Sequence, residues 1–137
     1  MERRKEEFLL SDDKELLDLS KICALLRDTY WAAERTPECI RKSIENSLCL
    51  GLYRKGELIG FARAITDYAT FTYFCDVIID SRFRNQGLGK WMMESFTQHP
   101  LLQTKSQTLV TKDAHALYAR YGFSIVEFMK RTIPPAP

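Results

Sequence analysis

The part of the chain best suited to bind an anion is the glycine-containing segment Arg84-Asn85-Gln86-Gly87-Leu88-Gly89-Lys90. It lies between an apolar run and the predicted start of a helix, where backbone N–H groups lack partners and the helix dipole is positive. Phosphate binds at such helix starts. Glycines 87 and 89 would let a diphosphate approach the backbone, and Arg84 and Lys90 add positive charge. Glycines also serve in simple turns, so the segment alone leaves both interpretations open.

This segment differs from two well-known nucleotide-binding motifs. A P-loop needs the spacing GxxxxGK[ST], and the dinucleotide fingerprint needs a third glycine and a following parallel unit. Residues 84–90 contain neither pattern. The phosphate interpretation therefore depends on the position of the segment between a strand and a helix.

The cysteines and histidines do not form a recognisable metal site. None of the four cysteines, Cys23, Cys39, Cys49 and Cys75, is paired at CxxC spacing, and the chain has only two histidines. Three of the cysteines lie within apolar patterns, and none stands beside a clear base. We therefore expect reduced cysteines, no metal and no cysteine nucleophile.

Hydrophobic periodicity predicts the elements that must position residues 84–90. Helical spacing occurs over residues 13–30, with Ser11 or Asp12 as the cap, and a second helix begins at Thr36-Pro37. In chain order we then expect a hairpin of residues 48–52 and 58–64 around a connection at 54–57, a strand at 70–79, a helix at 87–98, a strand at 108–110, a helix ending before Gly122, and a closing strand at 123–129. This order predicts an α/β fold, with a mixed, mostly antiparallel sheet and helices on both faces.

Length and charge restrict the class of protein. Residues 1–137 correspond to a single domain, and residues 132–137 are expected to be a loose tail because prolines cannot continue a strand ladder. The net charge is +2 and the basic residues are spread along the chain, so nucleic acid is not an expected partner. No apolar run approaches 18 residues and no signal peptide is visible, so we expect a cytoplasmic protein without a membrane partner.

Two landmarks carry a resemblance to a known family. Residues 84–89 resemble the Arg/Gln-x-x-Gly-x-Gly/Ala signature of the GNAT N-acetyltransferase superfamily, and residues 113–123 resemble its late helix with a tyrosine and a closing Gly-Phe. The order of elements is similar from about residue 8 to residue 129. The chain departs from the family pattern at Thr111, where many relatives have asparagine, at Ser81, where proline is common, and near Ser106, where some carry a glutamate base.

The resemblance implies an N-acetyltransferase that uses acetyl-CoA. Backbone groups at Val77, Ile78 and Ile79 would hold the pantetheine arm and orient the acetyl carbonyl, and residues 85–90 would hold the pyrophosphate. Tyr118 would donate a proton to the departing CoA thiolate. Judged by its helical spacing alone, Tyr118 would be a core aromatic.

A protonated amine acceptor must lose a proton before it attacks. Asp76 is our first candidate for the base, because it stands in an otherwise apolar strand, where burial would raise the pKa of its carboxyl. The alternative is an aspartate bonded to a backbone group or a basic side chain. Tyr30 and Glu34 are weaker candidates, on the side where the family resemblance places the acceptor.

These observations favour direct attack by a primary amine, in a small molecule or a peptide, on acetyl-CoA in a ternary complex. The alternatives are an acyl-CoA-binding module without catalysis and a phosphate-binding domain unrelated to CoA. A sheet edge or the closing strand could also pair two chains in a homodimer.

Overall fold

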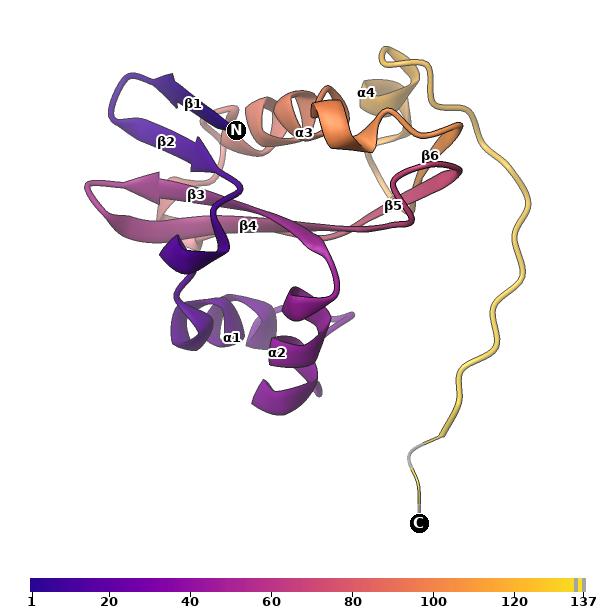
Figure 1. The fold of residues 1–137 in the computed structure, drawn as a ribbon, viewed down its shortest axis with the longest axis horizontal. Helices are drawn as coiled ribbons and strands as arrows, with labels where there is room; N and C mark the ends of the chain where they lie inside the picture. The colour runs from indigo at the N-terminus through magenta and orange to yellow at the C-terminus, as the bar shows by residue number, and fades with distance from the viewer. Residues whose placement is uncertain (135, 137) are drawn as a thin grey trace.

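The computed structural model describes residues 1–134 and 136, and it contains one six-stranded sheet with helices packed on it (Figure 1). The strands, in spatial as well as sequence order, are β1 (Glu2–Lys5), β2 (Phe8–Ser11), β3 (Leu48–Arg54), β4 (Glu57–Thr66), β5 (Phe71–Ile79) and β6 (Ser106–Leu109). The helices are α1 (Leu19–Arg27), α2 (Pro37–Glu45), α3 (Leu88–Thr97) and α4 (His115–Ala119). Short 3₁₀ turns occur at Lys14–Leu16, Ser81–Phe83 and Pro100–Leu102.

The sheet is antiparallel from β1 to β5, and only the β5–β6 pair is parallel. The predicted β3–β4 hairpin is present, but its connection is two residues rather than four. Lys55 and Gly56 both have positive φ, 49° and 80°. Two consecutive left-handed residues are typical of the tight type I′ turn, whose twist matches that of the strands.

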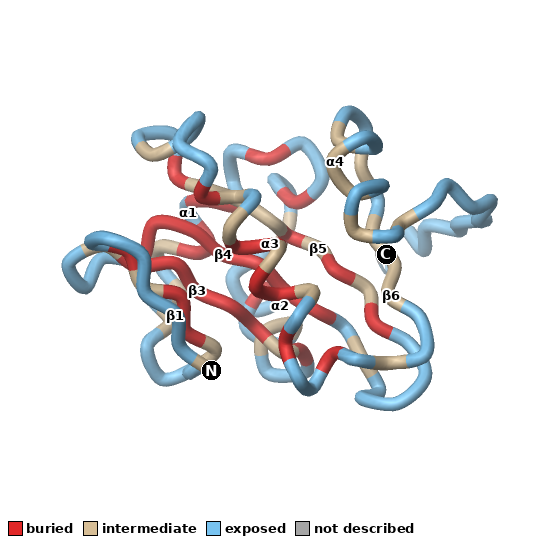
Figure 2. The backbone as a smooth tube through the Cα atoms, turned by 90° about the horizontal axis from the view of Figure 1, so that it is seen from above, coloured by how far each residue is buried: buried red, intermediate tan, exposed pale blue. Residues whose placement is uncertain are grey.

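Helices cover both faces of the sheet, as predicted from the sequence (Figure 1). On one face, Met92 and Phe96 of α3 are buried in the same cluster as Phe74 of β5. On the other face, Ile22 of α1 and Ile40 of α2 are buried in a second cluster with sheet residues. The central strands β3 and β4 are accordingly almost entirely buried, while the turns around them are exposed (Figure 2). The prediction of a mixed, mostly antiparallel α/β sheet is confirmed.

The first part of the chain differs from the prediction of one long helix over residues 13–30. Helix α1 begins only after Asp18, whose side chain accepts from the Lys21 N–H, and neither Ser11 nor Asp12 caps it. Residues 13–18 of the predicted helix contain the 3₁₀ turn Lys14–Leu16 instead, and the β1–β2 hairpin precedes them. All of β1 is charged and exposed, so it carries no apolar alternation from which a strand could be predicted.

The predicted closing strand at residues 123–129 is absent. Helix α4 ends as expected before Gly122, which has a φ of 88°, but the chain then runs on without regular structure to residue 134 (Figure 1). Ile125, Val126, Phe128 and Met129 are between 66% and 96% exposed. Residues 135 and 137 of the expected tail lie outside the described residues. The β-branched and aromatic pattern of this segment is real, but the segment has no strand beside it.

Candidate donor and acceptor site

A β-bulge interrupts β5 in the middle of the sheet. Between the pairs Arg63–Cys75 and Phe61–Ile78, β5 uses one residue more than β4. Asp76 lies in this bulge with a φ of 54°, an uncommon conformation for any residue other than glycine. Bulges bend a strand and re-aim its side chains, so this one changes the direction of β5 where the sequence predicted the acetyl site.

The second half of β5 has an open edge. Strand β6 pairs with β5 only from Phe71 to Phe74, and no β6 partner continues along Cys75–Ile79. Val77, Ile78 and Ile79 are half-buried there. A polar extended ligand could therefore bind the backbone groups on this edge of β5 as an added strand would.

The open edge leads to the start of α3. Gly87 is the N-cap residue, with a φ of 78°, and no side chain in the described part of the protein caps this helix. Asn85 is also left-handed, with a φ of 65°. A Cβ built at Gly87 would meet nothing within 4 Å, and one at Gly89 would touch only Ile79, at 3.7 Å. Space is therefore open beside Gly87, and the first N–H groups of α3 lack a side-chain cap and carry the positive end of the helix dipole.

Charged side chains fix the approach to this helix start. Arg84 donates from Nε to the Ile79 carbonyl at 3.1 Å, which ties the segment to the end of β5. Asp80 is buried and accepts from Arg82 and, at 2.9 Å, from Lys21 of α1. These bonds, with that from Arg82 first, lower the pKa of the Asp80 carboxyl far below its usual range. The role of Asp80 could not be predicted from the sequence, because its Lys21 partner lies 59 residues earlier.

Tyr118 lies on α4, the helix that follows β6. Its ring packs edge-on against Phe123, with 5.8 Å between centroids, and against the same apolar cluster that Val77 and Ile79 contact. Within residues 1–134 and 136 its hydroxyl has no hydrogen-bond partner. Burial raises the pKa of this phenol above its ordinary value. Tyr118 therefore keeps its proton at neutral pH and has it available to donate.

Asp76 does not have the raised pKa that we expected of a base. Its Oδ2 accepts from Arg35 Nη1 at 2.7 Å and from Arg63 Nε at 2.9 Å, and its Oδ1 accepts from Trp31 Nε1 at 3.1 Å. Burial by itself raises the pKa of Asp76, but the bonds and charges of the two arginines outweigh it, so the pKa is lowered. The expectation of a raised pKa is wrong, and the alternative, a carboxylate bonded to basic side chains, describes the geometry.

The connection between α1 and α2 carries the two weaker candidates. Tyr30 is 73% exposed, packs edge-on against Trp31 and lies under the Lys112 ammonium, which is 4.0 Å from the ring centroid. Because Lys112 belongs to the connection between β6 and α4, this contact joins two loops that are far apart in sequence. Glu34 is exposed, and no bond to it is formed in the described part of the chain.

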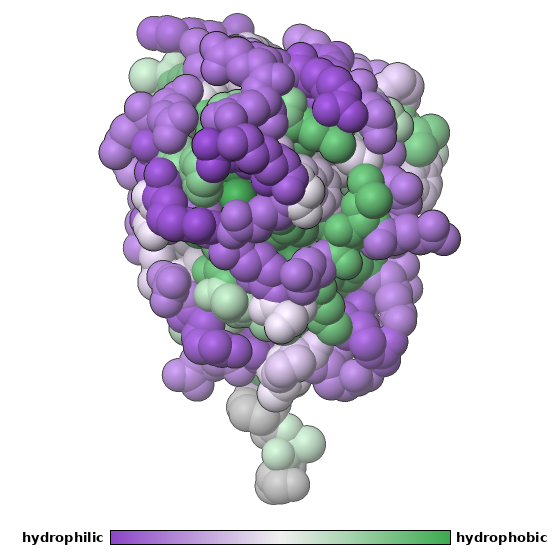
Figure 3. Space-filling model, turned by 90° about the vertical axis from the view of Figure 1, so that its left-hand side faces the viewer, coloured by the Kyte–Doolittle hydropathy of each residue, from purple (hydrophilic) through white to green (hydrophobic). Residues whose placement is uncertain are grey.

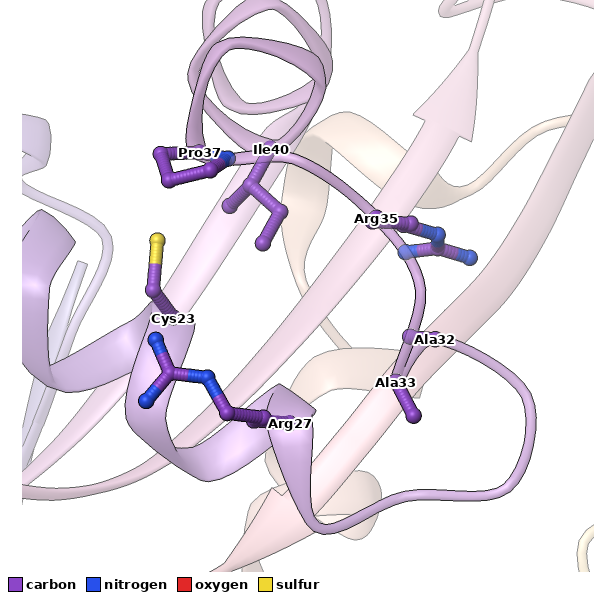
Figure 4. A pocket seen from close by; sticks show the side chains of 7 residues that line it. All are labelled: Cys23, Arg27, Ala32, Ala33, Arg35, Pro37 and Ile40. Carbon is purple, nitrogen blue, oxygen red and sulfur yellow. The ribbon is translucent and has the colours of Figure 1, made fainter. Parts of the chain in front are cut away.

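A small cavity lies under this connection (Figure 4). Its volume is about 20 Å³, and its lining comprises Cys23, Arg27, Ala32, Ala33, Arg35, Pro37 and Ile40. Such a volume holds about one water molecule. Figure 4 shows the guanidinium groups of Arg27 and Arg35 pointing in different directions, so they do not form a joint anion site. The cavity is therefore too small to receive an acceptor substrate.

Two further features are missing from residues 1–134 and 136. No group of three metal-ligating side chains occurs in this part of the chain, and none of its helices combines the length and hydrophobicity needed to cross a membrane. The side from which the β1–β2 and β3–β4 turns project is dominated by hydrophilic side chains, with smaller hydrophobic areas between them (Figure 3).

Comparison with known proteins assigns the family. The sequence profile of the acetyltransferase (GNAT) domain matches residues 45–125. A crystal structure described as a GNAT-family acetyltransferase from Xanthomonas campestris pv. campestris is 39% identical, with a TM-score of 0.86, over 93% of this chain and 94% of that one. Histone acetyltransferase TAP1 of Glycine max is 32% identical over 82% of this chain, which spans 42% of TAP1.

A more distant structure shares the fold alone. N-acetylglutamate synthase from Neisseria gonorrhoeae, complexed with coenzyme A and N-acetyl-glutamate, is 16% identical with a TM-score of 0.73, over 90% of this chain and 30% of that one. The chain spans less than two thirds of the length of the curated relatives that it matches, 61% in one and 42% in another. The profile match covers more than half of the chain, and the bulged β5 and open α3 start lie within it. The chain therefore belongs to the GNAT family of acetyltransferases.

Proposed function

We propose that this chain is an acetyl-CoA-dependent N-acetyltransferase, in which a primary amine attacks the thioester directly in a ternary complex. The observation that carries this proposal is the continuous path from the open edge of β5 to the uncapped start of α3. An extended pantetheine arm followed by a diphosphate has the shape and the hydrogen-bonding groups that this path requires.

The α3 start would hold the pyrophosphate. Free backbone N–H groups at residues 87–90 would donate to phosphate oxygens, and Lys90 would add a charge. The open space around Gly87 supports this role, because no side chain competes for the helix start. Arg84 is already tied to Ile79 through Nε, so it contributes charge from a fixed position.

The open edge of β5 would hold the pantetheine amides and the acetyl carbonyl. Residues 77–79 offer their backbone groups beyond the last β6 pair, at Phe74. Tyr118 would then protonate the CoA thiolate as it leaves. Its half-buried ring, and a hydroxyl without a hydrogen-bond partner among the described residues, support this role, since a phenol with a raised pKa remains an acid.

The described residues offer no good base for the amine. Asp76 has a lowered pKa and three donors bonded to it, so it is a poor proton acceptor. We propose that it positions the α1–α2 connection instead, and that the amine loses its proton to water. Burial raises the pKa of the nearby Cys75 thiol to about 11. A thiol that stays protonated favours direct attack over an acyl-cysteine intermediate.

The acceptor would bind where the α1–α2 and β6–α4 connections meet. The exposed Tyr30 and Trp31, with Glu34 nearby, form the wall that an amine would meet on its way to the β5 bulge. One relative is named as a histone acetyltransferase and one structural neighbour holds N-acetyl-glutamate. We therefore propose a small-molecule or peptide amine as the acceptor class.

The test is a screen of amine acceptors with acetyl-CoA, in which a thiol reagent detects released CoA. Amine-dependent thiol release that yields an acetylated amine supports the proposal. Calorimetry on the same protein separates the alternatives. Tight CoA binding without acetylation of any amine would favour the non-catalytic acyl-CoA-binding module. If neither CoA nor acetyl-CoA produced heat, both the acetyltransferase and the binding module would be excluded.

A further inference from the structure

We propose that residues 123–129 of one chain add to the free edge of β6 in a second copy of this chain, so that two copies exchange strands reciprocally. The proposed donor and the proposed edge belong to the same sequence, and both are unpaired in the described structure.

Residues 123–129, the segment that would be given to the second copy, have the sequence pattern of a strand but pair with no strand in the described chain. The segment combines β-branched, aromatic and aliphatic residues, and beyond the half-buried Phe123 all of its large apolar side chains are exposed: Ile125 is 82% exposed, Val126 70%, Phe128 66% and Met129 96%. No hydrogen bond connects residues 124–134 to another part of the described chain. A contiguous exposed apolar segment of this kind marks an interaction site.

The acceptor edge is the last strand of the sheet. Strand β6 pairs with β5 through Phe71–Ser106 to Phe74–Leu109, and along residues 107–109 the opposite edge has no strand beside it in the described chain. An unpaired edge offers a row of N–H and C=O groups to an incoming strand. Neither β6 nor the residue on either side of it contains a proline, which is one of the devices that block such addition.

The path of the chain favours a second copy over the chain's own β6. Tyr121 donates to Glu94 of α3, and Phe123 packs on Tyr118, so the chain is fixed on the α3 face up to residue 123. Beyond Gly122 the segment runs extended away from the body (Figure 1). In a closed twofold dimer each copy would give its segment to the other, so both apolar segments and both edges would be covered at once.

Strand exchange would also support the site. Helix α4 has only five residues and none of them is buried. A helix this short receives little stability from its own hydrogen bonds. Pairing of residues 123–129 with a partner would fix the chain immediately after α4, and hence the position of Tyr118.

The first experiment measures the molar mass of the full chain by light scattering during size exclusion. We expect twice the 16.0 kDa mass of one chain. The variant Val126→Asp should return the mass to that of one chain, because the added carboxylate cannot be buried at the interface. The control Tyr68→Asp places the same charge on another exposed apolar residue and should leave the dimer intact. A monomeric parent chain, or a dimer that survives Val126→Asp, overturns the proposal.

Cysteine cross-linking tests whether the edge of β6 pairs with residues 123–129 of the other copy. Chains carrying Cys39→Ser would be given one new cysteine each, either at Thr108 or at one of residues 125, 126 and 127, so that every register is sampled. Oxidation of a mixture should yield a disulfide-linked heterodimer from one chain of each kind. A second test uses one chain that carries both new cysteines. If this chain forms an internal disulfide and keeps the mass of one chain, residues 123–129 pair with their own β6, and the proposal is wrong.

Discussion

At Asp76 a single carboxylate accepts hydrogen bonds from three side chains, two of them from the α1–α2 connection. Arg63, from the neighbouring strand, is itself buried and also donates to Ser47. Removing a carboxylate from a buried pair leaves a guanidinium without compensation, which typically costs about 3–5 kcal/mol. The left-handed backbone at this position restricts the replacement to a residue such as asparagine, which tolerates it.

We therefore predict that Asp76→Asn lowers the free energy of unfolding by about 3 kcal/mol. Denaturant unfolding measures this change. Because the pKa of Asp76 is lowered in the folded state, its contribution is present above the ordinary aspartate pKa and is lost as the pH falls below about 4. The parent should lose stability across that window, and the variant should lose less. A variant of parental stability that has lost only kcat would identify Asp76 as the base instead.

Tyr118 combines a half-buried ring with a hydroxyl that has no hydrogen-bond partner among the described residues. We predict that Tyr118→Phe lowers kcat by about 10²-fold, the lower end of the range for a general acid, with KM for acetyl-CoA nearly unchanged. In the parent, kcat should fall at alkaline pH as the phenol ionises, and this limb should be absent in the variant. Steady-state kinetics over a pH series measures both effects.

Tyr53→Phe is the matched control for Tyr118→Phe. Tyr53 is buried in the other apolar cluster, and its hydroxyl also lacks a partner within the described chain. Its removal should leave kcat and the pH profile unchanged. Equal losses in the two variants would mean that the effect of Tyr118→Phe is structural.

Single residues were predictable where the signal was local. Gly87 and Gly122 were placed at a helix start and just after a helix end, and both have the left-handed backbone that glycine allows. The surroundings of Asp76 were not predictable, because Arg63 and Arg35 lie 13 and 41 residues away. The sequence revealed a carboxylate in an apolar strand but not the two guanidinium groups that lower its pKa.

Among the elements, the start of α3 offers the sharpest test of the donor site. Gly87→Asp and Gly87→Asn introduce side chains of nearly the same shape, both tolerant of a positive φ, into space that holds no other atom within 4 Å of the new Cβ. Only the aspartate brings a negative charge toward the diphosphate. We predict that it binds CoA at least about tenfold more weakly than the asparagine variant, or about 1.4 kcal/mol. Calorimetry gives both constants, and equal affinities would rule out phosphate binding at this helix start.

The elements themselves were predictable where their apolar pattern meets a partner in the same chain. The β3–β4 hairpin, β5 and α3 were predicted because each has a buried face of the expected period. Strand β1 was not, since its side chains are all charged and exposed. Residues 123–129 fail for the opposite reason: their pattern is that of a strand, but pairing depends on an edge that the folded chain does not bring to them.

For the whole molecule, binding of acetyl-CoA should raise stability. The ligand would contact β5, the α3 start and α4 together, and the unfolded chain has no such site. At a concentration of about 100 times Kd, linkage predicts about 2.7 kcal/mol of stabilisation. For a domain of this size we predict a rise in Tm on the order of 10 °C. Thermal unfolding with acetyl-CoA measures it, and Gly87→Asp at the same concentration should show little rise. An unchanged parent Tm would contradict the donor site.

The hydrogen bonds at Asp76 have a consequence for any attempt to change the proposed acceptor range. Trp31 and Arg35 join the proposed acceptor wall to the bulge in β5, the strand proposed to hold acetyl-CoA, so a change at either residue would also reach β5. Substitutions at either residue should disturb the affinity for acetyl-CoA as well as for the amine. Redesign of the acceptor range should leave both unchanged and begin with Glu34, whose exposed side chain can be replaced without moving the bulge.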